Sequence, residues 1–317
     1  MRNLKTLIMT IFLASFFILS GCIEQEKDKP SENSSILYVK EGYFNSISNA
    51  INSSQEGNTI IVSNGTYYET IIIDKSIILK AEDPLMAVLT SKENELHEND
   101  YIIINSDNVT VEGFKIINNY KNEDIKGIKI NSSNNIIRNN TFQNIRYGIY
   151  TESDTSNNKI HDNSLNTTFT GIYISFSNNN KIFNNRAMNS TYGIYFNHVY
   201  NSDIYSNNLS FNEYGLRLKG STDNYVYKNN FSLNEEGAYT CCGARLNKIY
   251  KNNFWNNTIN GDDVLENSWY YEESGNYWSD YTEKYPNANQ TGIFWDEPYE
   301  IYGGRNFDVY PLINPIK

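Results

Sequence analysis

The sequence is short of proline, methionine, histidine and positive charge. Its 317 residues include six prolines, four methionines and three histidines, and 26 Lys and Arg stand against 37 Asp and Glu. The resulting formal net charge of −11 argues against a nucleic-acid-binding surface, because a phosphate backbone repels an acidic protein. With three cysteines and three histidines, the chain also has few soft ligands for a metal such as copper.

A helical repeat is excluded as well. No repeated unit shows the 3.6-residue spacing of apolar residues that a helical solenoid requires. Asparagine is abundant instead, at about one residue in six. Asparagine favours turns, because its side chain bonds to neighbouring backbone groups and it tolerates the left-handed conformation. We therefore expect a chain with many turns.

Residues 1–22 have the composition of an export signal. Arg2 and Lys5 precede the apolar run "LIMTIFLASFFILS", which closes on Leu-Ser-Gly-Cys. That ending resembles a lipobox, so we expect cleavage and lipidation at Cys22, with a plain secretory signal as the alternative. Residues 23–36 are polar and aperiodic, which predicts a flexible tether. We therefore expect an extracytoplasmic protein, anchored to the outer face of the cell membrane through a lipid on Cys22.

Glycine recurs about every 22 residues in the second third of the chain. The repeat glycines are Gly127, Gly148, Gly171, Gly193, Gly215 and Gly237. Behind each one, two apolar residues flank an outward position, as Ile172 and Ile174 do, which is the alternation of a half-buried strand. A lone aliphatic residue follows later in each unit: Ile137, Ile160, Ile182, Ile204, Val226 and Ile249. A third inward position follows an asparagine pair: Phe142, Leu165, Met188, Leu209, Phe231 and Phe254.

Three short apolar stretches cannot close a core within one unit, so each unit must lie on the next. The sequence therefore predicts an all-β fold, a right-handed parallel β-helix of three-strand coils over residues 37–264. We expect the asparagine pairs to stack at one corner and bond along the axis; they are Asn139-Asn140, Asp162-Asn163, Asn184-Asn185, Asn207-Asn208, Asn229-Asn230 and Asn252-Asn253. Helical spacing in Phe44–Ile51 predicts an N-terminal capping helix, and the aromatic, non-repeating residues 265–317 predict a C-terminal cap.

Several stretches together resemble the NosD-like family of parallel β-helix proteins. They are "SISNAINSSQEGNTIIVSNGTYYETIIIDKSIILKAE", the Gly-Ile-x-Ile coils with their asparagine pairs, and the endings "GNYWSDY" and "GIFWDEPYEIYGGRNFDVYPL". The resemblance implies a pectin-lyase-like solenoid found in exported and surface proteins. The family is named after an accessory protein that helps to assemble the copper centre of an enzyme, so the resemblance also implies an accessory role of that kind. Family members often carry an acidic Ca²⁺-binding turn near the C-terminus, but Asn287, Asn289 and Thr291 stand at the matching positions here, with Asp296 and Glu297 nearby.

Two columns of side chains are expected to point outward from the coils. The first is two residues after each repeat glycine: Lys129, Tyr150, Tyr173, Tyr195, Arg217 and Tyr239. The second follows the lone aliphatic residue: Arg138, His161, Phe183, Tyr205, Tyr227 and Tyr250. Flat rings at strand spacing suit the apolar faces of sugars, and Tyr or Arg can bond sugar hydroxyls. The alternative is that the rings only stabilise neighbouring strands.

Catalytic and metal sites have weaker signals. A polysaccharide lyase or hydrolase on this fold needs clustered carboxylates or an Arg or Lys base, and no column stacks several acids. The "GDD" at residues 261–263 suits a loop N-cap equally well. His198 and Cys242 occupy the same register, but two coils apart, about 9.6 Å. Cys241 and Cys242 could form a vicinal disulfide or stay free. We expect no resident metal or cofactor, with Ca²⁺ and copper as alternatives.

The sequence thus favours a surface protein that binds rather than catalyses. We expect its first outward column to present a rigid face to a cell-surface polysaccharide or to an envelope protein. Two alternatives stay open at this point: a polysaccharide lyase or hydrolase, and a NosD-like accessory role in copper-enzyme assembly.

Overall fold

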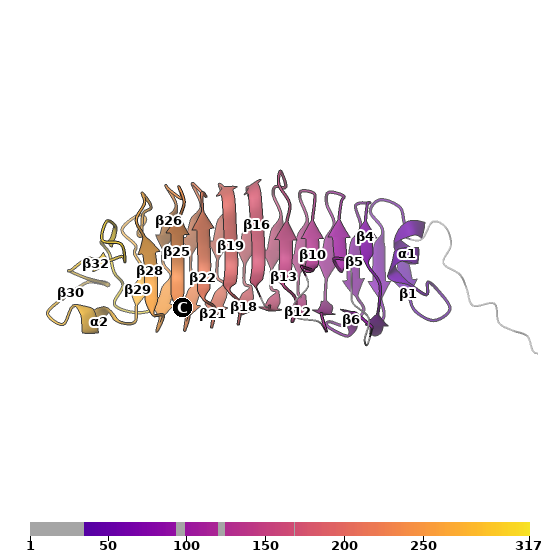
Figure 1. Ribbon diagram of the computed structural model, residues 1–317, viewed down its shortest axis with the longest axis horizontal. Coiled ribbons are helices and arrows are strands. Elements are labelled where there is room, and N and C mark those ends of the chain that lie inside the picture. The colour runs from indigo at the N-terminus through magenta and orange to yellow at the C-terminus, as the bar shows by residue number, and fades with distance from the viewer. Residues whose placement is uncertain (1–34, 93–98, 120–123, 168) are drawn as a thin grey trace, which may run out of the picture.

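The computed structural model describes residues 35–92, 99–119, 124–167 and 169–317. It is a long rod of stacked parallel coils, with the N-terminal helix α1 at one end and the aromatic cap at the other (Figure 1). The predicted parallel β-helix is confirmed. The predicted signal, most of the tether and the lipidation site Cys22 lie outside the described residues. Within the described ranges, no helix has the length and apolarity that crossing a membrane takes.

Each coil contributes one strand to each of three parallel sheets, which we name faces 1, 2 and 3. Face 1 runs β1 (Ile36–Val39), β2 (Thr59–Val62), β5 (Ile78–Ala81), β8 (Thr110–Glu112), β11 (Ile136–Arg138), β14 (Lys159–His161), β17 (Lys181–Phe183), β20 (Asp203–Tyr205), β23 (Tyr225–Tyr227) and β26 (Lys248–Tyr250). Face 2 runs β4 (Ile71–Ile73), β7 (Ile102–Ile104), β10 (Lys126–Ile130), β13 (Tyr147–Thr151), β16 (Thr170–Asn178), β19 (Tyr192–Tyr200), β22 (Tyr214–Lys219), β25 (Glu236–Cys241) and β28 (Ile259–Asp263). Face 3 runs β3 (Gly65–Tyr67), β6 (Ala87–Thr90), β9 (Phe114–Ile117), β12 (Thr141–Gln143), β15 (Ser164–Asn166), β18 (Arg186–Met188), β21 (Asn208–Ser210), β24 (Asn230–Ser232), β27 (Asn253–Trp255) and β29 (Tyr277–Trp278).

The interior is built from three columns of apolar side chains, one from each face. On face 1, for example, Ile160 pairs with Ile182 and Ile182 with Ile204, and all three are fully buried. The predicted inward residues are confirmed with one exception. In face 3 the residue between Leu165 and Leu209 is Ala187, not Met188, because the strand register places the buried side chain two residues after the corner asparagine Asn185.

The repeat glycines fit where a side chain cannot. A Cβ built on Gly193 would lie 2.6 Å from the carbonyl oxygen of Gly215 in the next coil. Backbone cannot yield there as a flexible side chain would. The coils therefore approach most closely along the glycine line, which explains why the residue returns in every unit.

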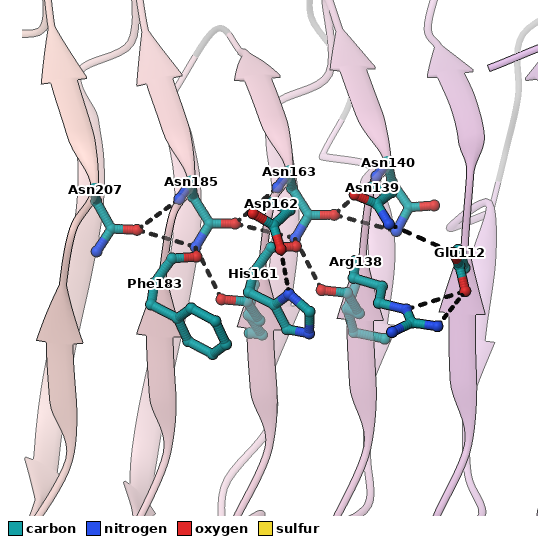
Figure 2. Close-up of polar contacts among 12 residues, drawn as sticks. Glu112, Arg138, Asn139, Asn140, His161, Asp162, Asn163, Phe183, Asn185 and Asn207 are labelled. Atoms are coloured by element: carbon teal, nitrogen blue, oxygen red, sulfur yellow. Dashed lines mark hydrogen bonds and ion pairs between the residues drawn. The ribbon is translucent and has the colours of Figure 1, made fainter. Parts of the chain in front are cut away.

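Buried asparagines form a ladder along the corner between faces 1 and 3. Its members are Asn140, Asn163, Asn185, Asn207, Asn229, Asn252 and Asn276. Asn207 shows the pattern: its Oδ1 accepts from the backbone N and the Nδ2 of Asn185 (2.9 and 3.1 Å), and its own Nδ2 donates to the carbonyl oxygens of Ile182 and Tyr205 and to Oδ1 of Asn229. Figure 2 shows four of these rungs in line. The carboxamide thus satisfies backbone groups that the bend removes from the strand ladders.

The asparagine pairs stack at one corner and bond along the axis, as predicted, but only one residue of each pair joins the ladder. In Asn184-Asn185 the second residue is the ladder member, whereas in Asn207-Asn208 the first one is, and Asn208 already starts β21. The ladder position is set by its distance from the buried residue of face 3, and the residue before it takes the left-handed conformation, as Ser206 does at φ 55°. Any residue that tolerates that conformation can precede the ladder, so the pair itself has no fixed place.

Two further ladders lie at the other two corners, and neither was predicted from the sequence. The corner between faces 2 and 1 carries Asn135, Asn158, Asn180, Ser202, Asn224, Asn247 and Asn267. The corner between faces 3 and 2 carries Ser190, Asn212, Asn234 and Asn257. Every bend of the coil therefore has an axial line of polar side chains.

Both ends of the rod are capped. Helix α1 (Ile47–Ser53) buries Ile47, Ala50 and Ile51, and its first backbone N–H groups donate to the carboxylate of Glu69, 2.8 and 3.0 Å away. The predicted capping helix thus forms, starting three residues later than Phe44.

At the other end, aromatic rings continue the core column of face 3. Phe254 stacks on Trp278 at 4.5 Å, and Trp278 stacks on Tyr299 at 4.0 Å. Strand β29 extends face 3 into the segment that we assigned to the cap, and α2 (Tyr281–Lys284) and the hairpins β30–β31 (Gln290–Thr291, Phe294–Trp295) and β32–β33 (Tyr299–Glu300, Phe307–Asp308) follow it.

Two buried aspartates hold the cap. Asp308 accepts from the backbone N of Asn276 and from Nε1 of Trp278, at 2.6 and 2.9 Å. Asp263 belongs to the "GDD" for which a loop N-cap and a catalytic role were both left open. It lies at the end of β28 and accepts from Nε1 of Trp269 at 3.0 Å. Burial raises the pKa of Asp308 to about 7, although these N–H donors work against that rise. Both carboxylates thus fix the indoles that close the core.

We expect Asn207→Ala to destabilise the protein by about 3 kcal/mol, because truncation leaves several buried backbone and amide groups without partners. The matched control is Asn208→Ala, in which the exposed neighbour is removed and stability should change by about 0.5 kcal/mol or less. Urea unfolding followed by circular dichroism measures both. Equal losses for the two variants would contradict the structural role of the ladder.

Candidate ligand-binding face

The predicted tyrosine–arginine column lies in register on face 2. Consecutive members face each other across neighbouring strands: Lys129 with Tyr150, Tyr150 with Tyr173, Tyr173 with Tyr195, Tyr195 with Arg217 and Arg217 with Tyr239. All six are half-buried and point away from the core. We name this set the tyrosine–arginine column.

A second column runs beside it, and the sequence analysis missed it. Its members immediately precede the repeat glycines: Lys126, Tyr147, Thr170, Tyr192, Tyr214 and Glu236. Strict alternation would turn these residues inward, but two consecutive residues are buried at each glycine, as Gly193 and Ile194 are. The residues on both sides of that pair, Tyr192 and Tyr195, therefore face outward together. Recurrence of Tyr before glycine was the available signal.

The rings of the two columns form one surface, although the second column is interrupted by Thr170, which is fully buried. Tyr150 stacks on Tyr173 at 4.9 Å, and Tyr173 meets Tyr195 edge to face at 5.1 Å. Tyr192 contacts Tyr195 at 4.9 Å and stacks on Tyr214 at 5.3 Å. Burial raises the pKa of Tyr150 and of Tyr195 to about 12, so these hydroxyls stay protonated and can donate hydrogen bonds at neutral pH.

Arg217 lies in the middle of the rings. Its guanidinium is 5.3 Å from the ring centre of Tyr192, 5.0 Å from that of Tyr195 and 5.7 Å from that of Tyr239. Nη1 donates to the hydroxyl of Tyr192 at 2.7 Å, Nη2 contacts Sγ of Cys241 at 3.7 Å, and Nε is buried without a partner. Among the described residues, no carboxylate lies within 4 Å of it.

Most other cations of the same face are paired with acids, although Lys219, at the end of β22, also has no carboxylate within 4 Å among the described residues. Lys129 forms an ion pair with Glu152 at 2.9 Å, and Arg146 and Lys126 both lie within 4 Å of Asp124. The positive charge of Arg217 is therefore unusual on this surface, because it is surrounded by rings instead of a carboxylate.

Glu236 ends the second column one strand further on. One of its oxygens, Oε2, is buried and has no hydrogen-bond partner. Burial, together with the charges of Asp262 and Glu213, raises the pKa of Glu236 to about 7, and the smaller effect of Arg217 opposes that rise. An acid with this pKa exchanges protons near neutrality, which is the property required of a general acid or base.

The second predicted column lies in register on face 1 and stacks more regularly. His161 stacks on Phe183 at 4.5 Å, and Phe183 on Tyr205 at 4.9 Å. At its start Arg138 donates twice to one oxygen of Glu112, from Nε and Nη2 at 3.0 and 2.7 Å, and Nδ1 of His161 lies 2.6 Å from Asp162 (Figure 2). Its charged groups thus have partners within the protein, unlike Arg217.

The two adjacent cysteines differ in their surroundings. Both have free thiols in this structure, Cys241 buried beneath Arg217 and Cys242 exposed. Burial raises the pKa of the Cys241 thiol, and Arg217 works against this rise. The vicinal disulfide stays a prediction. In the turn at which family members often bind Ca²⁺, Asp296 accepts from the backbone N and from Nδ2 of Asn289, at 2.7 and 3.0 Å, so neighbouring amides already contact both of its oxygens.

Comparison with known proteins gives a family and a fold. Residues 101–283 match the family model described as periplasmic copper-binding protein (NosD). A cell surface glycoprotein of Methanothermus fervidus is 31% identical over 144 residues, which cover 44% of this chain and 21% of that protein. The chain therefore spans about a fifth of the length of this relative.

Solved structures resemble the chain in fold alone. The A-module of the mannuronan C-5 epimerase AlgE6 of Azotobacter vinelandii has a TM-score of 0.54 and 14% identity, over 74% of this chain and 75% of that one. The tailspike protein gp49 of the Acinetobacter baumannii bacteriophage Fri1, a capsular polysaccharide depolymerase, has a TM-score of 0.57 and 9% identity, over 78% and 60%.

The described residues do not fit a copper ion. They contain no group of three His, Cys, Asp or Glu side chains that could hold a metal. His198 stacks flat on Phe176 at 4.7 Å, with its Nδ1 on Oδ1 of Asn197 at 3.0 Å, and lies two coils from Cys242. We therefore derive no step through copper.

We expect Glu236 to make the protein less stable as the pH rises. Between about 4.5 and 7, folded Glu236 keeps a proton that the unfolded chain has lost, so the folded state loses stability across this window. In Glu236→Gln the melting temperature should fall less between pH 4.5 and pH 7.5 than in the wild type. Glu235→Gln, at the exposed neighbouring acid, is the control and should follow the wild type. Parallel curves for all three proteins would contradict the raised pKa.

Proposed function

The chain belongs to the NosD family of parallel β-helix proteins, and we propose that it works outside the cytoplasm as a surface module that binds polysaccharide through face 2. The observation that carries the proposal is the paired array of half-buried tyrosines around Arg217. Rings of this kind stack on the apolar faces of sugars, and protonated phenols and a guanidinium donate to sugar oxygens.

The comparisons support the location outside the cytoplasm. The matched family is described as periplasmic, and the relative in Methanothermus fervidus is a cell surface protein. Attachment to the membrane through a lipid on Cys22 remains part of the proposal. An envelope protein is the alternative partner, because Tyr and Arg are also enriched in protein interfaces. Carbohydrate is proposed because the phenols and the guanidinium together supply donors for sugar oxygens.

The binding test removes two rings of the tyrosine–arginine column. We expect Tyr173→Ala with Tyr195→Ala to abolish retention on polysaccharide columns or in affinity electrophoresis. Truncation also removes ring contacts, which are worth about 0.5–1.5 kcal/mol each, so a control with the same loss is needed.

Face 1 supplies that control. Tyr205 and Tyr227 stack on each other at 5.1 Å on face 1. Tyr205 lies in the same coil as Tyr195, and Tyr227 lies in the next coil. Tyr205→Ala with Tyr227→Ala should lower the melting temperature by a similar amount and keep retention. Loss of retention in both double variants, or in neither, would contradict binding by face 2.

A polysaccharide lyase or hydrolase remains the second candidate because of Glu236. This acid has a pKa near neutrality and lies one strand from Arg217, on the same face. We expect such an enzyme to release reducing or unsaturated ends from acidic or neutral polysaccharides, and to lose that activity in Glu236→Gln. If no polysaccharide of the panel releases such ends, the lyase or hydrolase candidate is excluded and binding is the function that remains. The accessory role in copper-enzyme assembly gains nothing from the described side chains and stays an expectation from the resemblance.

A further inference from the structure

We propose that Arg217 and Glu236 form a subsite for an acidic sugar, in which Arg217 takes the carboxylate of a uronic acid unit and Glu236 bonds a hydroxyl of the same chain. This inference rests on the proposed function and narrows it to one class of polysaccharide.

Arg217 has more hydrogen-bond donors than the protein supplies with acceptors. A guanidinium carries five N–H donors in a fork that matches a carboxylate. Here Nη1 uses one donor on Tyr192, Nη2 makes a long contact with the thiol of Cys241, and Nε is without an acceptor. An arginine that is surrounded by rings and lacks an anionic partner is short of acceptors, and a ligand can supply them at the Nη groups.

Glu236 has the opposite shortage, because one of its carboxyl oxygens receives no hydrogen bond. Its Oε2 lacks a donor, yet no ion pair joins it to Arg217, because register places Glu236 opposite Tyr214 and Arg217 opposite Tyr239. Arg217 thus lacks hydrogen-bond acceptors and Glu236 lacks a donor. The two residues lie on adjacent strands but do not bond each other. Because Oε2 is buried, a ligand would bond half-buried Glu236 through its other carboxyl oxygen. A uronic acid unit, which carries a carboxylate and hydroxyls a few ångströms apart, fits Arg217 and that oxygen together.

Tyrosine rings continue along face 2 from Arg217 and Glu236. Toward the N-terminus, Tyr195, Tyr173 and Tyr150 offer rings and hydroxyls at strand spacing. Neutral sugar faces can stack there, and the cations beyond, such as Lys129, are already paired with acids. A polymer that follows the column would thus present its charge to the one position in the column where a cation lacks a carboxylate partner in the described structure.

The ionisation of Glu236 adds a pH dependence. An anionic ligand near Glu236 is repelled less when this acid is protonated, so we expect affinity for a uronate polymer to fall as the pH rises through about 7. The groups that face Glu236 are Asp262 from β28, Glu213 and Arg217 from the preceding coil, and Glu235 beside it. Asp262 and Glu213 act in the same direction as the ligand charge, and Arg217 opposes them.

The test compares a charged polymer with its uncharged ester. Full-length protein is run in affinity gels with polygalacturonate, with alginate and with fully methyl-esterified polygalacturonate, at an ionic strength that screens the repulsion between an acidic polymer and a protein of net charge −11. We expect the wild type to bind the two acids at least about tenfold more tightly than the ester, because a hydrogen bond between a guanidinium and a carboxylate is stronger than one to a neutral ester. Arg217→Gln should lose this preference and keep the weaker binding to the ester.

Further variants separate the subsite from general charge and from misfolding. Arg186→Gln removes an exposed arginine of face 3 and should behave as the wild type, while Arg217→Lys keeps the charge without the fork and should recover part of the preference. Glu236→Gln should flatten the pH dependence between pH 5 and pH 8. Melting curves identify any variant that has unfolded.

The outcomes distinguish the subsite from the wider function. Equal wild-type binding to polygalacturonate and its ester, or an unchanged preference in folded Arg217→Gln, overturns the subsite while carbohydrate binding stands. If the wild type retains neither acidic polymer but retains neutral glycans, the subsite is likewise overturned and the binding function survives. Retention of no glycan overturns both.

Discussion

The axial hydrogen bonds of the corner asparagines are the interaction on which the rest of the structure depends. A parallel coil has three bends, and at each bend the backbone leaves the strand ladders with donors and acceptors unpaired. A carboxamide such as that of Asn207 satisfies its own coil and both neighbours at once. Because each rung must meet the next, a coil that gained or lost a residue between corner and strand would break its rung. The ladders therefore enforce the period of about 22 residues.

Fixed register has a direct consequence on the outside of the rod. When every coil starts from the same rung, residues at equal distances from it lie above one another, and side chains of one kind form columns. On face 1 the column is a stack of rings at whose start Arg138 bonds Glu112 and His161 contacts Asp162. On face 2 two columns lie side by side, so the same constraint produces a surface two side chains wide.

Sequence periodicity predicted the coils, the buried columns and the outward position of the tyrosine–arginine column, because each of these repeats with the strand period. It failed where the backbone departs from alternation. Ala187 was missed because a small residue carries little hydrophobic signal beside Met188. Tyr192 was missed because two buried residues follow it at Gly193. Whether an arginine has a partner depends on contacts between coils, so neither the isolation of Arg217 nor the buried oxygen of Glu236 could be foreseen.

The contrast between Arg138 and Arg217 separates structure from function on this rod. Both project outward from a strand beside aromatic rings, and Arg138 has a structural account because Glu112 holds it with two hydrogen bonds. At position 217 stability requires no charge, since tyrosines fill the positions on both sides of it in the column. A guanidinium placed among rings gives up hydration, and a chain with a net charge of −11 has many acids that could have neutralised it. Cation–π contacts offset part of that loss, but they do not explain a fork with free donors. The residue is better explained by something that the protein binds than by the fold that carries it.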